Sequence, residues 1–408
     1  MILSSCKSDL IIVDETSDPP VINSSKLDTL WTIKLPSDSK MFSVNPVFWN
    51  NMIITSQYNF SDKQTEEIIS YDIDSLKQIW MWNNFEGNAL EQIKPFGNLS
   101  RFVSGDNLIF TSDEIYCLNM NSGSLIWSNL DNNGLIIKSK TDITKFYTTY
   151  KNYGWSAELG INTWKHSVFE FTINDGANEE VIGFPFDDLW ETQTGLPTVW
   201  QNINGEELFL IPCVKFRFDP FEIYSNVYLY NRTLDSIIWY HENLEPEGLN
   251  VNPAIYSDGK IYFRTGHDIY CFDETTGNIL WQRQISEGMI SGNWILHENK
   301  LFVNTDNISF YALDPATGNT LWHNNTDCGN VADMVYFKGK IYFGSLGDGK
   351  LHCVDASNGN TIWNEVSPNK NKSGCNDASF QNSVAIDSIR NCLYTTDGYF
   401  LLSISLPE

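Results

Sequence analysis

Cysteine is the residue type in this chain that could most readily support redox or zinc chemistry. The eight cysteines stand at positions 6, 117, 213, 271, 328, 353, 375 and 392 of the 408-residue sequence. No two are adjacent or separated by two residues, whereas a zinc ribbon or a thioredoxin-type centre needs a Cys-x-x-Cys pair. The spacing excludes both. One disulfide could form, between Cys328 and Cys375, because both lie in loops expected to enter successive structural units.

Histidines and acidic residues also lack the spacing of a metal centre or a catalytic site. The six histidines show no metal-ligand spacing between neighbours, and His352 is expected to pack within a strand. Residues 131–134 and 348–350 begin like calcium loops but do not continue into the EF-hand pattern, so turns are expected. Asp333 and Asp377 are expected to be solvated carboxylates near a central channel. We predict no catalytic residue, no metal and no cofactor.

Composition and charge indicate a globular protein and argue against binding to nucleic acid. The chain has 51 acidic and 26 basic residues and a formal net charge of -25, so its field repels phosphate backbones and anionic lipid. Hydrophobic residues make up 42% and aromatic residues 14%, which is typical of a globular protein. No apolar run approaches the roughly 18 residues of a membrane-spanning helix. Nucleic acid is therefore an unfavourable partner, and a spanning helix is not expected.

The start of the chain resembles the lipobox of bacterial lipoproteins, in which a signal peptide is removed just before a cysteine that becomes acylated. The matching residues are Leu3-Ser4-Ser5-Cys6, which implies a lipid on Cys6. Residues 7–26 are rich in Ser, Asp and Pro and indicate a flexible tether. The five residues before Cys6 contain neither a basic n-region nor a full apolar h-region. An ordinary N-terminus is the alternative.

A twelve-residue motif recurs along the chain and determines the fold prediction. Its clearest copies run from Tyr116 to Trp127, Tyr270 to Trp281, Tyr311 to Trp322 and His352 to Trp363. Each has an alternating apolar start, Asp or Asn at the fourth position, Gly at the eighth and Trp at the twelfth. The Asx side chain can bond its own backbone to start a turn, and Gly supplies a positive φ that ends it. The motif predicts a β-hairpin.

Degenerate copies bring the number of repeats to eight. Tyr71 to Trp80 is two residues shorter, Tyr228 to Trp239 has Asp235 in the Gly position, and Phe169 to Glu180 replaces Trp by Glu. The segment around Trp31 is expected to be an outer strand alone. Short apolar strands that follow polar turns, such as Ile261-Tyr-Phe and Ile341-Tyr-Phe, also number eight. Four short strands per repeat predict an all-β, eight-bladed β-propeller of four-stranded antiparallel blades.

The ends of the chain are expected to close this propeller. After Trp363 the sequence contains strands but no further outer strand with Trp, and the segment of Trp31 supplies it. Closure removes the exposed sheet edges. We therefore expect a tether at residues 1–26 and a single propeller at residues 27–408.

The Tyr-x-Leu-Asp-x-x-Thr-Gly-x-x-x-Trp pattern resembles the PQQ-like repeat of quinoprotein-type propellers. In that family the motif Trp and Gly dock between adjacent blades. The resemblance implies a structural role for the repeat tryptophans at positions 31, 80, 127, 239, 281, 322 and 363. With Cys6, the whole plan is similar to the lipoprotein propeller of the bacterial outer-membrane β-barrel assembly machinery.

Residues 143–240 depart most from the repeat and are the predicted binding region. The blades lengthen there, and 21 of the 98 residues are aromatic, against 56 of 408 overall. Aromatic residues beside carboxylates suit a protein interface or the stacking of a sugar ring. Packing beneath their own long loops is the alternative. Four tryptophans outside the repeat position are the candidate exposed contacts: Trp155, Trp164, Trp190 and Trp200.

These features favour a non-catalytic, lipid-anchored protein of the bacterial cell envelope. We expect a monomer whose propeller binds protein partners, in a role such as outer-membrane protein assembly, and which reaches the outer membrane only through its lipid. A propeller that binds a glycan or another small ligand is the alternative. A PQQ-dependent dehydrogenase is a third hypothesis, but the chain lacks the vicinal cysteines, the haem motif and the extra loop length of those enzymes.

Overall fold

The computed structural model describes fifteen segments of the chain. They are residues 27–34, 40–42, 46–59, 66–84, 101–111, 114–129, 134–156, 161–185, 191–218, 221–245, 253–285, 288–306, 309–325, 332–370 and 378–406. Cys6, Trp190, Cys328, Cys375 and Asp377 lie outside these segments, so the lipid, the disulfide and two site predictions remain predictions. No helix long and apolar enough to cross a membrane occurs in the described segments.

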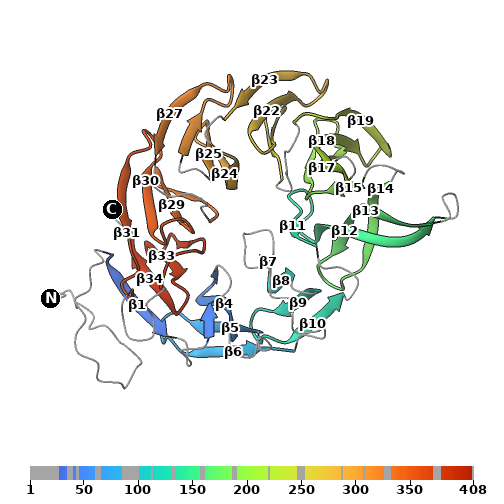
Figure 1. Ribbon diagram of the computed structural model, residues 1–408. Helices are drawn as coiled ribbons and strands as arrows, with labels where there is room; N and C mark the ends of the chain where they lie inside the picture. Colours follow the sequence, from blue (N-terminus) through green and yellow to red (C-terminus); the bar gives the residue numbers. More distant parts are fainter. Residues whose placement is uncertain are drawn as a thin grey trace. The chain divides into compact units, whose positions relative to one another are not determined.

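The strands form eight antiparallel sheets (Figure 1). The chain divides into two compact units. The first unit comprises Met1–Gly97, Ile308–Phe310 and Asn324–Glu408, and the second comprises Asn98–Asn307 and Tyr311–His323. Two sheets have five strands, because two short strands there share one long partner. The predicted all-β chain of eight blades is confirmed.

Three sheets belong to the first unit. They are β1 (Thr29–Lys34) with β32 (Ala385–Asp387), β33 (Cys392–Thr396) and β34 (Phe400–Ser405); β2 (Lys40–Phe42), β3 (Val47–Trp49), β4 (Met52–Asn59), β5 (Glu66–Asp72) and β6 (Gln78–Trp82); and β28 (Val335–Phe337), β29 (Lys340–Gly344), β30 (Leu351–Asp355) and β31 (Thr361–Glu365).

Four sheets belong to the second unit, and one has residues in both. The four are β7 (Arg101–Ser104), β8 (Asn107–Thr111), β9 (Ile115–Asn119) and β10 (Leu125–Asn129); β11 (Ile136–Lys138), β12 (Lys145–Ser156), β13 (Ile161–Thr172) and β14 (Asn178–Pro185); β15 (Glu191–Thr194), β16 (Thr198–Gln201), β17 (Glu207–Phe218), β18 (Phe221–Asn231) and β19 (Ser236–His241); and β20 (Ile255–Ser257), β21 (Lys260–Arg264), β22 (Asp268–Asp273) and β23 (Ile279–Gln284). The last sheet is β24 (Ile290–His297), β25 (Lys300–Thr305), β26 (Ser309–Leu313) and β27 (Thr320–Asn325).

The repeated motif forms the hairpin between the third and fourth strands of a sheet. In sheet β20–β23, the Asp273 carboxylate accepts the backbone N–H of Thr276 at 2.8 Å, and the Asp273 carbonyl accepts that of Gly277 at 2.9 Å. Gly277 has a φ of +71°, a conformation that costs a residue with a Cβ free energy. The Asx and Gly positions of the sequence motif thus specify the turn.

A β-bulge precedes the repeat Trp in the fourth strand. In sheet β20–β23, Trp281 pairs with Cys271 and Ile279 pairs with Phe272, so Leu280 is the extra residue. The same irregularity occurs in β1, β6, β10, β19 and β31. Because a bulge bends its strand and increases the local twist, it shapes the outer edge of each of these sheets.

The register corrects the sequence reading of one repeat. Ser70 pairs with Trp80 as Cys271 pairs with Trp281, so this repeat has full length and begins at Ile69. The reading from Tyr71 as a shortened copy was wrong, because Ile69 replaces the usual Tyr. Leu76 stands in the Gly position of this repeat, with a φ of +57°.

Closure by the N-terminal strand is confirmed within the first unit. Strand β1 pairs antiparallel with β34, and Trp31 lies opposite Ser403. The Trp31 ring stacks on Tyr394, with ring centroids 5.7 Å apart. One sheet is therefore built from both ends of the chain.

Buried aromatic and aliphatic residues fill the space between successive sheets of each unit. In the second unit, one cluster joins Trp200 and Leu210 to Ile261 and Phe263 of the next sheet. The cysteines of the repeat belong to such clusters: Cys117, Cys271 and Cys353 are fully buried free thiols. Burial raises the pKa of Cys117 to about 12 and that of Cys271 to about 11. These cysteines therefore pack as small apolar residues of the core.

Candidate functional site

Three repeat tryptophans lie against glycines of the following sheet, as the resemblance implies. A Cβ added to Gly277 would lie 2.7 Å from the Trp239 ring, and one on Gly318 would lie 2.6 Å from Trp281. The indole N–H of Trp239 donates to the Glu274 carbonyl at 2.9 Å. Trp127 contacts Gly176 in the same way, and donates to the Ile173 carbonyl at 2.8 Å. These tryptophans join neighbouring sheets and are not available to a ligand.

The junction between sheets β11–β14 and β15–β19 is built differently. Glu180 stands in the Trp position and Asp235, with a φ of +49°, in the Gly position. The bulge is displaced to Val181, since Glu180 pairs with Phe169 and Ile182 with Val168. Both members of the Trp–Gly contact are therefore missing at this junction.

A charged network centred on Arg232 joins these two sheets instead. Arg232, in the turn after β18, forms ion pairs with Glu170 and Glu179 of the preceding sheet, and lies 3.4 Å from a Glu207 oxygen. The Glu170 side chain is only 5% exposed and also lies 2.7 Å from the Lys145 ammonium. Burial lowers the pKa of Arg232, but the bond to Glu170 and the nearby carboxylates raise it overall. The guanidinium therefore stays charged.

Aromatic packing beneath the network holds the same junction. Tyr147 lies edge-on to Phe209 with ring centroids 5.1 Å apart, and Phe184 contacts Tyr228 at 5.0 Å. These residues belong to one apolar cluster that spans β12–β14 and β16–β18. Several aromatic residues of the predicted binding region thus pack in the interior, which is the alternative that the sequence left open.

Strands β12 and β13 form an unusually long hairpin (Figure 1). Their ladder runs from the pair Lys145–Thr172 to the pair Ser156–Ile161, whereas β21 and β22 form five pairs. β14 accompanies β13 only as far as Lys165, and β11 pairs with residues 146–148 of β12. Residues 152–156 and 161–164 thus form a ribbon of two strands within the described chain, which we call the β12–β13 ribbon.

Two of the four candidate tryptophans lie in this ribbon. Trp164 is directly opposite Tyr153, and Trp155 is opposite Asn162. Residues directly opposite each other share a face of a ribbon, and residues two apart in a strand share it too. The register therefore assigns Tyr153, Trp155 and Trp164 to one face.

Trp200 is buried, and the prediction that it is an exposed contact is wrong. Its side chain is 6% exposed, stacks on Tyr256 at a centroid distance of 4.4 Å and donates to the Glu274 carboxylate at 2.7 Å. Trp200 lies in β16, next to the following sheet, so packing rather than binding explains this aromatic residue. The glycan-binding alternative loses one of its four aromatic residues.

Sequence reasoning missed three exposed aliphatic residues at the tips of turns. Ile143 is 75% exposed between β11 and β12, Ile203 is 100% exposed between β16 and β17, and Leu234 is 61% exposed between β18 and β19. Glu207 connects these turns, because it accepts a hydrogen bond from the Thr141 hydroxyl at 3.2 Å and its N–H donates to the Thr233 hydroxyl at 3.0 Å. An apolar residue inside an otherwise polar turn was the available signal.

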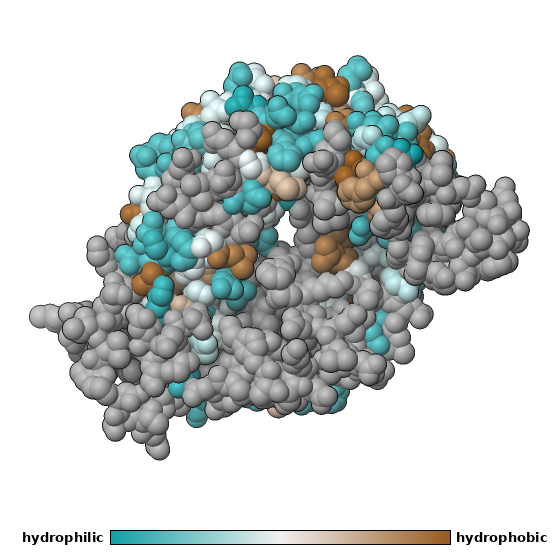
Figure 2. Space-filling view, in the orientation of Figure 1, coloured by the Kyte–Doolittle hydropathy of each residue, from teal (hydrophilic) through white to brown (hydrophobic). Residues whose placement is uncertain are grey.

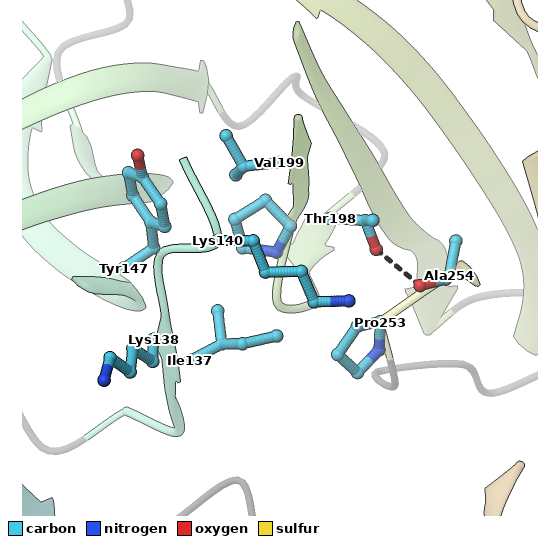
Figure 3. A pocket seen from close by; sticks show the side chains of 9 residues that line it. Ile137, Lys138, Lys140, Tyr147, Thr198, Val199, Pro253 and Ala254 are labelled. Atoms are coloured by element: carbon cyan, nitrogen blue, oxygen red, sulfur yellow. Dashed lines mark hydrogen bonds between the residues drawn. The ribbon is translucent and has the colours of Figure 1, made fainter. Parts of the chain in front are cut away.

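Figure 2 shows that hydrophobic residues are scattered among hydrophilic ones on the face that it draws. The second unit also has a small pocket, lined by Ile137, Lys138, Tyr147, Thr198 and Pro253 among others (Figure 3). Thr198 donates to the Ala254 carbonyl at 2.7 Å across it. Its volume of about 30 Å³ is enough for about one water molecule and too small for a sugar ring.

One cluster of titratable groups lies beside β22. Glu245 accepts the Thr265 hydroxyl and lies 2.8 Å from the His267 Nδ1 atom. Burial, and then the charge of Glu245, raise the pKa of the neighbouring Asp268. Across the described segments, no group of three or more His, Cys, Asp or Glu side chains could hold a metal ion.

The fold and the docked repeat motif define an eight-bladed β-propeller whose repeat resembles the PQQ-like repeat. Residues 224–401 match the family model described as outer membrane protein assembly factor BamB, which confirms the resemblance to PQQ-like propellers. No curated protein matches the sequence.

Solved propellers align with nearly the whole chain. BamB from Moraxella catarrhalis is 15% identical, with a TM-score of 0.56 over 94% of this chain and 98% of that one. Saccharomyces cerevisiae Sqt1 is 10% identical, with a TM-score of 0.62 over 94% and 100%. A europium-containing methanol dehydrogenase is 10% identical, with a TM-score of 0.61 over 94% of both. At these identities the likeness shows the fold alone.

Proposed function

We propose that this protein is a non-catalytic scaffold of the bacterial cell envelope, anchored by a lipid on Cys6, that binds other proteins during outer-membrane protein assembly. The match of residues 224–401 to the assembly-factor family supports the process. The lipobox-like start and the residues that follow it support the anchor. The methanol dehydrogenase likeness is one of fold, at 10% identity, and supports no quinone chemistry in this chain.

The β12–β13 ribbon is the observation that carries the binding role. A two-stranded ribbon without a third strand is marginally stable in water, and its free edges can accept another strand. A chain that keeps such a ribbon, with Tyr153, Trp155 and Trp164 on one face by register, gains from a partner that covers it. Aromatic residues are enriched among the energetically dominant residues of protein interfaces.

The charge of the surrounding surface indicates the chemistry of the partner. Exposed carboxylates of Glu179, Glu180 and Asp235 lie at the same junction as the exposed Leu234. The chain as a whole carries a formal charge of -25. A partner surface with Lys or Arg residues around an apolar centre would complement it in both charge and hydrophobicity.

The test is a crosslinked pull-down of the full-length protein from its native envelope, with mass spectrometry of the co-purifying proteins and of the N-terminal peptide. A shortened variant replaces residues 153–164 by Asn-Gly, which joins the paired residues Asn152 and Lys165 through a two-residue turn. We expect acylated Cys6 and a stoichiometric barrel-assembly or secretion component with the wild type. Recovery of that component should fall about tenfold or more with the shortened variant.

Two controls separate the parts of this proposal. The double variant Trp155→Ser/Trp164→Ser keeps the ribbon backbone and should lose the partner if the aromatic face carries binding. Cys6→Ser should abolish membrane association but leave the purified protein able to bind the partner. An unmodified N-terminus would refute the anchor, and undiminished recovery with the shortened variant would refute the ribbon as the binding element.

A further inference from the structure

A latch joins the segment that follows β19 to the β21–β22 turn of the next sheet. The Ser225 N–H donates to the Glu245 carbonyl at 3.1 Å, so the backbone at Glu245 lies along β18. The Glu245 side chain is buried, and it accepts hydrogen bonds from the Thr265 hydroxyl, from the His267 N–H at 3.2 Å and from His267 Nδ1 at 2.8 Å. We call Glu245 together with residues 265–268 the Glu245 latch.

Asp268 is a second buried carboxyl in this latch, and it has few hydrogen-bond donors. The residue is 7% exposed, and its Oδ1 atom has no hydrogen-bond partner among the described residues. Its Oδ2 atom accepts the Gln282 side-chain amide at 3.2 Å and lies 3.3 Å from the Tyr270 hydroxyl. An ionised carboxylate that leaves water without a full set of donors loses more free energy than a neutral acid. The surroundings of Asp268 therefore favour the neutral acid.

The Tyr270 hydroxyl does not supply the missing donor. It lies 3.0 Å from the Leu244 carbonyl and 3.3 Å from Asp268 Oδ2, and its single hydrogen can serve only one of them. The carbonyl is the nearer acceptor and has no other donor within the described segments. Burial, and then the charge of Asp268, raise the pKa of Tyr270, so the phenol keeps its hydrogen. With that hydrogen on Leu244, a bond between Tyr270 and Asp268 requires a proton on the carboxyl.

Glu245 is the carboxyl of the latch that keeps its charge. It accepts three hydrogen bonds, and donors to a carboxylate favour its ionised form. Burial, and then the charge of Glu245, raise the pKa of Asp268, whose ordinary value is about 3.9. His267 and Tyr270 are the other titratable groups that act on Asp268, and β23 contributes the uncharged Gln282. The two carboxyls thus differ in protonation because their environments differ.

We propose that Asp268 is a neutral carboxylic acid at neutral pH and that its proton holds the Glu245 latch closed. The acid O–H donates to the Tyr270 oxygen, and the Tyr270 O–H donates to the Leu244 carbonyl, so one proton completes a chain of bonds from β22 to the segment that follows β19. Loss of this proton places two carboxylates in one buried cluster, and their repulsion weakens the hold of Glu245 on the turn. The seam between sheets β15–β19 and β20–β23 is therefore sensitive to pH. The inference depends neither on the proposed partner nor on a lipid at Cys6.

Carbon-13 NMR of the full-length protein, labelled at the aspartate carboxyl carbons, measures this proton directly. The Asp268 resonance is assigned by its loss in Asp268→Asn. At neutral pH it should have the chemical shift of a protonated acid, and it should move to that of a carboxylate as the pH is raised. In Glu245→Gln, which removes the neighbouring charge, the midpoint should move to lower pH. An Asp268 resonance already at the carboxylate position at neutral pH would overturn the proposal.

Amide hydrogen exchange of the wild-type protein tests the latch itself. The probe is the His267 N–H, which donates to Glu245, and its exchange rate is divided by that of an unstructured peptide at the same pH. Opening exposes Asp268 to water, where its pKa is ordinary, so the closed latch binds the extra proton and loses stability as the pH rises through the raised pKa. Below that raised pKa, the opening constant should increase about tenfold for each pH unit above about 4.

Two variants identify the group responsible. Asp268→Asn has nearly the shape of the neutral acid, and its opening constant should not show this increase. Asp258→Asn is the matched control, because Asp258 is an exposed aspartate in the β20–β21 turn of the same sheet, and it should keep the wild-type increase. A wild-type opening constant that is independent of pH, or an equal increase in Asp268→Asn, would refute the latch.

Discussion

Two junctions of the second unit solve the same packing problem with different chemistry. Between sheets β15–β19 and β20–β23, the Trp239 ring lies on Gly277 and its N–H reaches the Glu274 carbonyl. Between sheets β11–β14 and β15–β19, Glu180 and Asp235 hold the corresponding positions, and Arg232 bridges the sheets. At the first junction a Cβ on Gly277 would lie 2.7 Å from the indole, and at the second both positions carry carboxylates instead. A cation then has to compensate the carboxylates.

The contrast shows which part of the repeat is indispensable. The ionic junction keeps a buried aromatic cluster, with Tyr147 against Phe209, below the charged layer. The Trp–Gly contact can therefore be exchanged for ion pairs at the outer edge, provided that the apolar layer between the sheets is retained. The β12–β13 ribbon and the three exposed aliphatic tips belong to the same two sheets.

The largest expected effect comes from filling the space beneath an indole. Gly277→Ala should destabilise the protein by about 3 kcal/mol, because the new Cβ would lie 2.7 Å from the Trp239 ring and the residue keeps a positive φ. Gly259→Ala is the matched control, since Gly259 has a φ of +72° and a Cβ there meets only the Glu274 carboxylate at 3.8 Å. The control should lose about 1 kcal/mol. Urea unfolding measures both, and equal losses would mean that the indole contact contributes nothing beyond backbone strain.

The next effect concerns the ionic junction. Arg232→Met should destabilise the protein by about 2 kcal/mol, because Glu170 is 5% exposed and would lose its guanidinium partner. Arg232→Lys should recover part of this loss, since it restores the charge without the fork geometry. Lys165→Met is the control: Lys165 and Glu180 form an exposed pair, and such pairs contribute at most about 1 kcal/mol. A loss for Arg232→Met no larger than the control would show that the aromatic layer alone holds this junction.

The features that could be predicted from the sequence involve residues that are close together in the chain. The Asx, Gly and Trp positions lie within nine residues, so their spacing predicts the hairpin and its turn directly. Arg232 and Glu170 are separated by 62 positions, and nothing in either local pattern pairs them. The same limit explains Trp200: it follows no repeat spacing, but its ring stacks on Tyr256 of the next sheet. Its burial depends on a neighbour that only the folded chain provides.

The β12–β13 ribbon could be predicted only in part from the sequence. An excess of aromatic residues at residues 143–240 indicated additional structure, and the structure divides those residues between a core cluster and an extended hairpin. Alternating aromatic residues suit either environment. The side chains of a strand alternate with a period of two whether one face is buried in the core or exposed for binding. Composition could therefore locate the region but not assign each side chain.

The smallest expected effect isolates the hydrogen bond of the docked tryptophan. Trp239→Phe keeps an aromatic ring over Gly277 but removes the N–H that donates to the Glu274 carbonyl at 2.9 Å, so we expect a loss of about 1 kcal/mol. Trp31→Phe is the comparison, because the Trp31 nitrogen has no hydrogen bond within the described segments and its ring stacks on Tyr394. Thermal unfolding of the two variants should place Trp239→Phe below Trp31→Phe. The reverse order would mean that ring contact, and not the indole hydrogen bond, distinguishes the Trp–Gly junction from the ionic one.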